Sequence, residues 1–138
     1  MTKKIDCRII EIPKISDPRG NLAVIENGVL PFEVKRVYYL FDVPSGSTRG
    51  GHAHKNLSQF LVALSGSFDV ILKNGTSEQR IVLNNPSKGL LIPPGIWREL
   101  ENFSSGAICL VIASDVYLEQ DYIRDFKAYV EFKEDLDN

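Results

Sequence analysis

The sequence predicts an all-β domain, a sandwich or barrel of short strands that ends in one helix. Short apolar or alternating segments are separated by turn residues at regular intervals, and helical spacing of apolar residues occurs only near the C-terminus. The 138 residues suit a single domain over 1–138, and a chain of this length can bury one hydrophobic core.

The predicted strands are bounded by residues that favour turns. The Asn74-Gly75 pair is the strongest of these signals, because this dipeptide favours a tight hairpin. The run 107–114 is continuously apolar, which indicates a strand buried on both faces. The strands are expected over 7–15, 21–26, 34–43, 57–64, 68–72, 80–83, 90–92 and 107–114.

The C-terminal segment has the spacing of a helix. We expect it to begin at Asp121, whose carboxylate can cap a helix, and to end near Phe132. Its apolar face would consist of Tyr122, Ile123, Phe126, Tyr129 and Val130.

Composition excludes several functional classes. The net charge of -2 and the absence of a basic cluster argue against nucleic-acid binding. The chain has no export signal and no apolar run of membrane-spanning length, so we expect a cytoplasmic protein with no membrane partner. Cys7 and Cys109 are therefore expected to be free thiols.

Two motifs carry the chemistry. The first contains His52 and His54, the only two histidines, followed by Gln59 and then Gly66. On a strand, residues two apart point to the same side, so both imidazoles would enter one pocket. The alternative is that the glycines at 50 and 51 place the histidine pair in a surface loop.

The second motif runs from Pro93 through Gly95 and Arg98 to Asn102, and the two motifs together resemble those of the cupins. The resemblance implies a double-stranded β-helix, or jelly-roll barrel. Cupins that bind a metal have Glu and His where this chain has Gln59 and Arg98. A guanidinium has no lone pair to offer and Gln is a poor ligand, so we expect no metal and no cofactor. A site of two histidines with a carboxylate from elsewhere is the alternative.

Four segments, 35–39, 49–55, 94–99 and 113–117, resemble the dTDP-4-oxo-6-deoxy-D-glucose 3,4-ketoisomerases. Arg49-Gly50 followed by His52 is also similar to the dTDP-4-dehydrorhamnose 3,5-epimerases, whereas Gly51 stands where a larger residue is expected. The resemblance implies that a dTDP-linked 4-keto-6-deoxyhexose is converted to a dTDP-3-oxo-6-deoxyhexose. It further implies a 3-amino-3,6-dideoxyhexose for a surface glycan, such as a lipopolysaccharide or an S-layer glycan, and a homodimer with exchanged N-terminal strands.

The resemblance also assigns catalytic roles. His52 would be the base, because the imidazole pKa lies near neutral pH. His54 would be a second proton carrier or would bind the sugar oxygens. Tyr38 would act as an acid or would be a core aromatic.

The other predicted site residues would bind the substrate. Arg49 would stabilise an oxyanion or hold phosphate, and Gln59 would point inward. Arg98 would influence product stereochemistry and favours the gluco product, because Arg replaces a titratable His. Trp97 would stack on the nucleotide base or pack a barrel end, whereas the basic residues Lys35, Arg36 and Lys55 would meet the pyrophosphate or lie in solvent.

Three alternatives to the ketoisomerase remain. A 3,5-epimerase would need proton carriers at two carbons, so Tyr and Asp placed for carbon 5 would favour it. A non-catalytic nucleotide-sugar-binding module would bind without proton exchange. A metal-dependent cupin would contain a bound metal despite Gln59 and Arg98.

Overall fold

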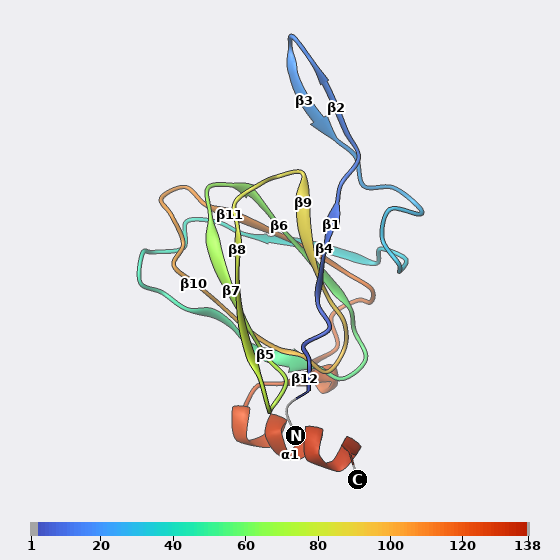
Figure 1. The fold of residues 1–138 in the computed structure, drawn as a ribbon, viewed down its shortest axis with the longest axis vertical. Helices are drawn as coiled ribbons and strands as arrows, with labels where there is room; N and C mark the ends of the chain where they lie inside the picture. Colours follow the sequence, from blue (N-terminus) through green and yellow to red (C-terminus); the bar gives the residue numbers. More distant parts are fainter. Residues whose placement is uncertain (1–2, 138) are drawn as a thin grey trace.

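The computed structural model describes residues 3–137, in which two five-stranded antiparallel sheets face each other (Figure 1). The first sheet has the order β1-β9-β6-β11-β4 and the second β12-β5-β10-β7-β8. The first consists of β1 (Arg8–Glu11), β9 (Lys88–Ile92), β6 (Gln59–Ser65), β11 (Ile108–Ala113) and β4 (Arg36–Leu40). The second consists of β12 (Tyr122–Ile123), β5 (Arg49–His54), β10 (Trp97–Glu101), β7 (Phe68–Lys73) and β8 (Glu78–Leu83).

The space between the sheets holds the largest hydrophobic core. Phe68, Val70 and Leu72 alternate along β7 and are fully buried in it, as a period of two requires. The Phe68 ring stacks on Phe103 with centroids 5.3 Å apart. This packing fills one part of the barrel interior and leaves another part open as a cavity.

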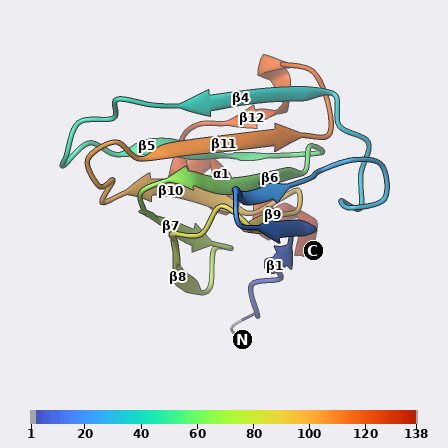
Figure 2. The ribbon, with the colours of Figure 1, turned by 90° about the horizontal axis from the view of Figure 1, so that it is seen from above.

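The outer face of the first sheet is only partly covered. Figure 2 shows β4, β11 and β6 following one another across this sheet. The segment 24–34 covers Phe60 and Val62 with Leu30 and other apolar side chains. Beyond this cover, apolar side chains of β4, β6 and the residue after β4 are exposed, namely Val37, Tyr39, Phe41 and Leu64.

A hairpin projects from the barrel at the end opposite the helix (Figure 1). It consists of β2 (Lys14–Asp17) and β3 (Gly20–Ala23). The prediction of one continuous strand over 7–15 is wrong, because the chain leaves the first sheet after β1 and Pro13 has no N–H for a ladder. Ile15 and Leu22 are paired across the hairpin, and both are more than half exposed.

The C-terminal helix begins later than predicted. The chain forms a short 3-10 turn (Glu119–Asp121), then β12, and only then α1 (Phe126–Asp137). Asp125 caps the helix by accepting a hydrogen bond from the Ala128 N–H at 3.0 Å. The predicted start at Asp121 is wrong because β12 pairs with β5 and holds this segment in extended conformation.

The predicted all-β class with a short C-terminal helix is confirmed. Strand β10 lies where the sequence indicated only a motif, and it occupies the middle of the second sheet. Cys7 and Cys109 are both free thiols. Within residues 3–137 no helix is long and apolar enough to cross a membrane.

Candidate active site

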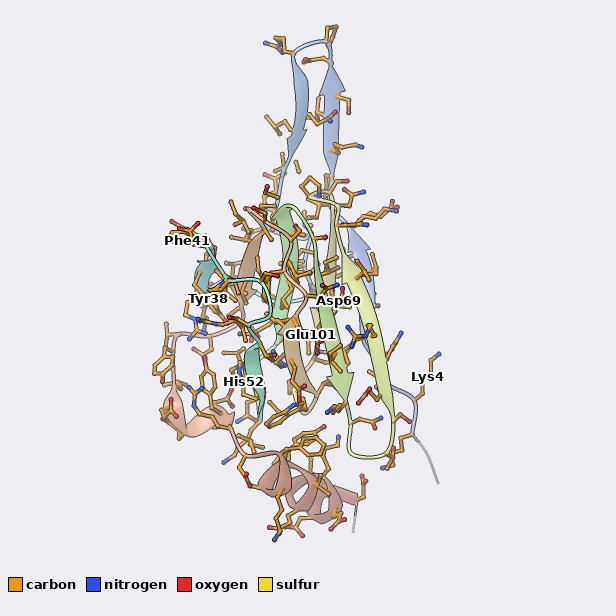
Figure 3. All side chains as sticks on the ribbon, turned by 90° about the vertical axis from the view of Figure 1, so that its left-hand side faces the viewer. Lys4, Tyr38, Phe41, His52, Asp69 and Glu101 are labelled. Carbon is orange, nitrogen blue, oxygen red and sulfur yellow. The ribbon has the colours of Figure 1, made fainter. Side chains whose placement is uncertain are left out.

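A cavity of about 460 Å³ lies between the sheets and opens to solvent. Its walls come from β4, β5, β6, β10 and β11 together with the segment that carries Tyr117, Tyr122 and Arg124. In Figure 3, Tyr38 of β4 and His52 of β5 lie on the same side of the barrel, above the C-terminal helix. The cavity therefore combines residues that are far apart in the sequence.

The two histidines lie on strand β5, so the surface-loop alternative is wrong. Gly50 has φ +76° and sits in a bulge opposite β10, a conformation that glycine adopts without strain. The rings of His52 and His54 are 4.9 Å apart at an interplanar angle of 84°. His52 lines the cavity, whereas His54 is fully buried.

Asp121 orients His54. Its Oδ2 lies 3.1 Å from the Nδ1 of His54, and its Oδ1 accepts a hydrogen bond from the Asn56 N–H at 2.8 Å. A carboxylate only accepts, so Nδ1 carries the hydrogen and Nε2 of the neutral ring is an unprotonated acceptor. The sequence missed this role, because Asp before an apolar helical pattern is also the usual sign of a helix cap.

A chain of hydrogen bonds connects Arg98, Gln59 and Tyr38. The Nη1 of Arg98 donates to Oε1 of Gln59 at 2.5 Å, and Nε2 of Gln59 donates to the Tyr38 hydroxyl at 3.2 Å. The Nη2 of Arg98 also donates to the Ile96 carbonyl at 3.1 Å. Because the Tyr38 hydroxyl accepts from Gln59, its own proton is free to be donated into the cavity.

Burial and positive charge keep the histidines neutral. Burial and the Arg98 guanidinium lower the pKa of His52 to about 2. Burial and the same guanidinium also lower the pKa of His54. Burial lowers the pKa of Arg98 itself to about 10, which still leaves it charged at neutral pH. His52 is thus a deprotonated imidazole beside fixed cations, and the expectation that its pKa lies near neutral pH does not hold in the folded protein.

Burial also sets the state of Tyr38. It raises the pKa of this phenol, so the hydroxyl stays protonated at neutral pH. The cavity accordingly contains a proton acceptor, His52, and a proton donor, Tyr38, on neighbouring walls. A site that moves protons on carbon and oxygen needs both groups.

Arg36 and Tyr122 complete the wall, and the sequence did not place them there. The Nη2 of Arg36 donates to the Tyr122 hydroxyl at 3.2 Å, and its Cζ lies 4.9 Å from the centre of the Tyr38 ring. The Tyr122 ring contacts both imidazoles, at 5.0 Å from His52 and 4.3 Å from His54. A signal for Arg36 was present, because residues 36, 38 and 40 share one side of a strand.

Three of the predicted substrate-binding residues, Arg49, Trp97 and Lys55, do not lie inside the cavity as Gln59 and Arg98 do. Arg49 lines the cavity but is exposed at its mouth. Trp97 does not line the cavity: it is buried against Phe126 and Tyr129 of α1, which fits the packing alternative. Lys55 is exposed and lines a different surface groove, together with residues of α1.

No metal-ligand cluster is found in the described part of the chain, where no three His, Cys, Asp or Glu side chains are grouped to hold an ion. The two positions that differ from metal-binding cupins, Gln59 and Arg98, are hydrogen-bonded to each other. Metal independence stays a prediction. It is checked by measuring activity after treatment with a chelator, which should leave the activity unchanged.

The fold and the cavity define the chain as a cupin-type barrel with a paired-histidine site. The family model described as FdtA, WxcM-like, C-terminal, matches residues 5–134. The chain therefore belongs to the FdtA/WxcM-like family of TDP-sugar 3,4-ketoisomerases, as the motifs predicted.

Individual relatives agree with this family. A TDP-4-oxo-6-deoxy-alpha-D-glucose-3,4-oxoisomerase from Aneurinibacillus thermoaerophilus is 48% identical over 127 residues, which cover 89% of this chain and 91% of the relative. A mutant of the QdtA 3,4-ketoisomerase from Thermoanaerobacterium thermosaccharolyticum, in complex with TDP-4-keto-6-deoxyglucose, is 40% identical. Its TM-score is 0.93, and the match covers 96% of this chain and 97% of that one.

The predicted relation to the epimerases is confirmed at the level of fold. The dTDP-4-dehydrorhamnose 3,5-epimerase from Bacillus anthracis matches with a TM-score of 0.75 at 15% identity. The match covers 85% of this chain and 77% of the epimerase.

Proposed function

We propose that this protein converts dTDP-4-oxo-6-deoxy-D-glucose to a dTDP-3-oxo-6-deoxyhexose by proton transfers through His52. The observation that carries the proposal is the unpartnered Nε2 of His52, which is buried at the wall of the cavity. A buried polar atom without a partner is unfavourable by about 1–3 kcal/mol unless a ligand satisfies it. Membership of the ketoisomerase family supports the choice of substrate.

The geometry supports a sequence of proton transfers. Nε2 of His52 takes the proton from carbon 3, which the neighbouring ketone makes acidic. The electrons of that C–H bond form the C3=C4 double bond, and oxygen 4 receives the π electrons of the ketone. Protonation of oxygen 4 gives an enediol. The Tyr38 hydroxyl lines the cavity and accepts a hydrogen bond from Gln59, which supports Tyr38 as the donor of this proton.

The second half of the reaction reverses these transfers at the other carbon. The hydroxyl on carbon 3 loses its proton, the ketone forms at carbon 3, and carbon 4 receives a proton. No electrons enter or leave, so the isomerisation needs no redox partner. His54 supports this step as a second proton carrier, because its Nε2 is a buried acceptor 4.9 Å, ring to ring, from His52.

The direct test follows the reaction by proton NMR in deuterated water, with His52→Asn beside the wild type. We expect the 3-keto product with deuterium at carbon 4, and a loss of turnover of about 1000-fold or more in the folded variant. Deuterium at carbons 3 and 5 without a 3-keto product would instead support the epimerase. Binding of the substrate without any exchange would support the binding module.

We propose further that the product has the gluco configuration. Arg98 stays protonated and donates to Gln59 and Ile96, so it cannot return a proton to the sugar as a histidine would. When the reaction is repeated in ordinary water, carbon 4 receives a proton, and the coupling between the hydrogens on carbons 4 and 5 distinguishes gluco from galacto. We expect Arg98→His to increase the galacto fraction, and an unchanged galacto product in both proteins would contradict the proposal.

The proposed product suits one further reaction class. A ketone at carbon 3 is a substrate for transamination, which would give a 3-amino-3,6-dideoxyhexose for a surface glycan. Addition of a sugar aminotransferase and an amino donor to the reaction mixture tests this step, with the 3-amino sugar nucleotide as the expected product. Accumulation of the 3-keto sugar with aminotransferases of this class would contradict it.

We propose that the protein is a homodimer in which the N-terminal hairpins are exchanged. The projecting hairpin exposes Ile15 and Leu22, and the first sheet exposes apolar side chains around Tyr39. Mutual cover of these two surfaces removes both from water. Light scattering tests the proposed dimer: we expect the wild type to be a dimer and Leu22→Lys to be a monomer. A monomeric wild type would overturn the proposal.

A further inference from the structure

Four buried side-chain nitrogen atoms of residues 3–137 have no hydrogen-bond partner, and all four lie around the ring of Tyr122. Two are the Nε2 atoms of His52 and His54, and two are the Nε and Nη1 of Arg36. Buried donors and acceptors are nearly always paired in folded proteins. Their concentration around Tyr122, where Arg36 and His52 line the cavity and His54 lies behind them, therefore indicates a place suited to bind a polar ligand.

The chemistry of the four atoms is complementary. The imidazole nitrogens are proton acceptors, whereas the two N–H groups of Arg36 are cationic donors. In the proposed isomerisation, carbon 3 loses a proton while oxygen 4, on the neighbouring carbon, becomes negative. An acceptor and a charged donor on the same wall match these two changes.

We propose that Arg36 is the group that binds oxygen 4 of the sugar as negative charge develops on it, a role that rests on the proposed isomerase function. As His52 removes the proton from carbon 3, the electron pair moves through the new C3=C4 bond to oxygen 4. One of the two free N–H groups of Arg36, at Nε or at Nη1, donates to that oxygen. A fixed charge in a partly dry cavity stabilises such an anion strongly without reorganising at the moment of reaction.

The surroundings hold Arg36 in place for this task. Its Nη2 donates to Tyr122, and its guanidinium lies over the rings of Tyr38 and Tyr117, at 4.9 Å and 5.6 Å from their centres. No described carboxylate forms an ion pair with it. The charge is therefore oriented by tyrosines and is not neutralised by a carboxylate.

This assignment separates Arg36 from Arg49, which the sequence placed in the same role. Arg49 is exposed at the mouth of the cavity, where water solvates its charge. Its effect on an oxyanion is screened there, because interactions weaken in high dielectric. Arg36 has its free donors in the interior, beside Tyr38 and Tyr122.

The test compares Arg36→Ala and Arg36→Lys with Arg8→Lys, an exposed arginine on β1 that does not line the cavity. We expect kcat to fall about 100- to 1000-fold in Arg36→Ala and by a smaller factor in Arg36→Lys, which keeps the charge but has neither free N–H group. Arg8→Lys should match the wild type. Affinity for TDP, measured by calorimetry, should change by less than about threefold.

Chemical rescue separates an electrostatic role from a structural one. Guanidinium added to Arg36→Ala should restore kcat by about tenfold or more at concentrations that leave the wild type unchanged, and ammonium at the same concentration should not. Thermal unfolding of each variant confirms that the fold is retained, and Arg36→Lys serves if Arg36→Ala does not fold.

Two results would overturn the inference. A loss of TDP affinity equal to the loss of kcat/KM, with kcat unchanged, would place Arg36 at the pyrophosphate. Full activity of a folded Arg36 variant would show that the side chain only packs. Absence of turnover in the wild type is a separate result, because it rejects the proposed isomerase itself.

Discussion

The same two sheets enclose two different interiors, an apolar core and a polar cavity. In the core, Phe68 stacks on Phe103 and Cys109 is fully buried among aliphatic side chains. In the cavity, His52 and Arg36 present polar atoms that no other side chain satisfies. The comparison shows that the apolar core stabilises the fold, whereas the cavity keeps unpaired polar atoms that a ligand can bind.

The largest expected effect on stability comes from the apolar core. Phe68→Ala should lower the free energy of unfolding by about 3–5 kcal/mol, because it removes a buried ring and leaves a cavity. Urea denaturation measures this loss. Leu136→Ala is the control, since this exposed side chain near the end of α1 should change stability by less than about 0.5 kcal/mol. A loss below about 1 kcal/mol for Phe68→Ala would contradict the assignment of the core.

Asp121→Asn is expected to have the next largest effect, on activity. The amide oxygen can still accept from the Asn56 N–H, but the amide NH₂ group would face Nδ1 of His54 and reverse its tautomer. We expect kcat to fall about 100-fold, the size of a general acid–base contribution. Steady-state kinetics and a melting curve measure both properties. Unchanged kcat in the folded variant would show that His54 takes no part in proton transfer.

The contrast between core and cavity also explains what could be predicted from the sequence. Alternation along a strand and turn dipeptides are local, so most strands and the paired histidines followed from them. The spacing of the two motifs is also local, and it singled out Gln59 and Arg98 through the resemblance to the cupins. The resemblance of four segments then identified the family. These features required no knowledge of how the strands pair.

The rest depended on contacts between distant segments. Tyr122 and Ile123 have the spacing of a helix with Phe126, yet β12 pairs with β5 because the barrel offers that edge. Asp121 then becomes a partner of His54 instead of a helix cap. Trp97 packs against α1 and does not face the cavity, because α1 covers that side of β10.

Arg98→Met separates stability from activity within the cavity. Removal of a fully buried cation relieves its desolvation, while Gln59 and the Ile96 carbonyl lose a donor. Since these two effects oppose each other, we expect the free energy of unfolding to stay within about 2 kcal/mol of the wild type. Activity should fall because Gln59 no longer holds Tyr38. Loss of stability comparable to Phe68→Ala would show that the buried cation is a major stabilising element.

The smallest expected effect concerns pH. The pKa of His52 is lowered from 6.5 to about 2, so the free enzyme keeps its base deprotonated in mild acid. The value of kcat/KM, which reports on the free enzyme, should therefore show no decrease with a pKa near 6.5 between pH 8 and about 5. Arg98→Met should move the acid-side decrease to higher pH than in the wild type, because it removes the nearby positive charge that most lowers the pKa of His52 after burial. A wild-type decrease centred near pH 6.5 would mean that neither burial nor the guanidinium groups of the cavity lower the pKa of His52.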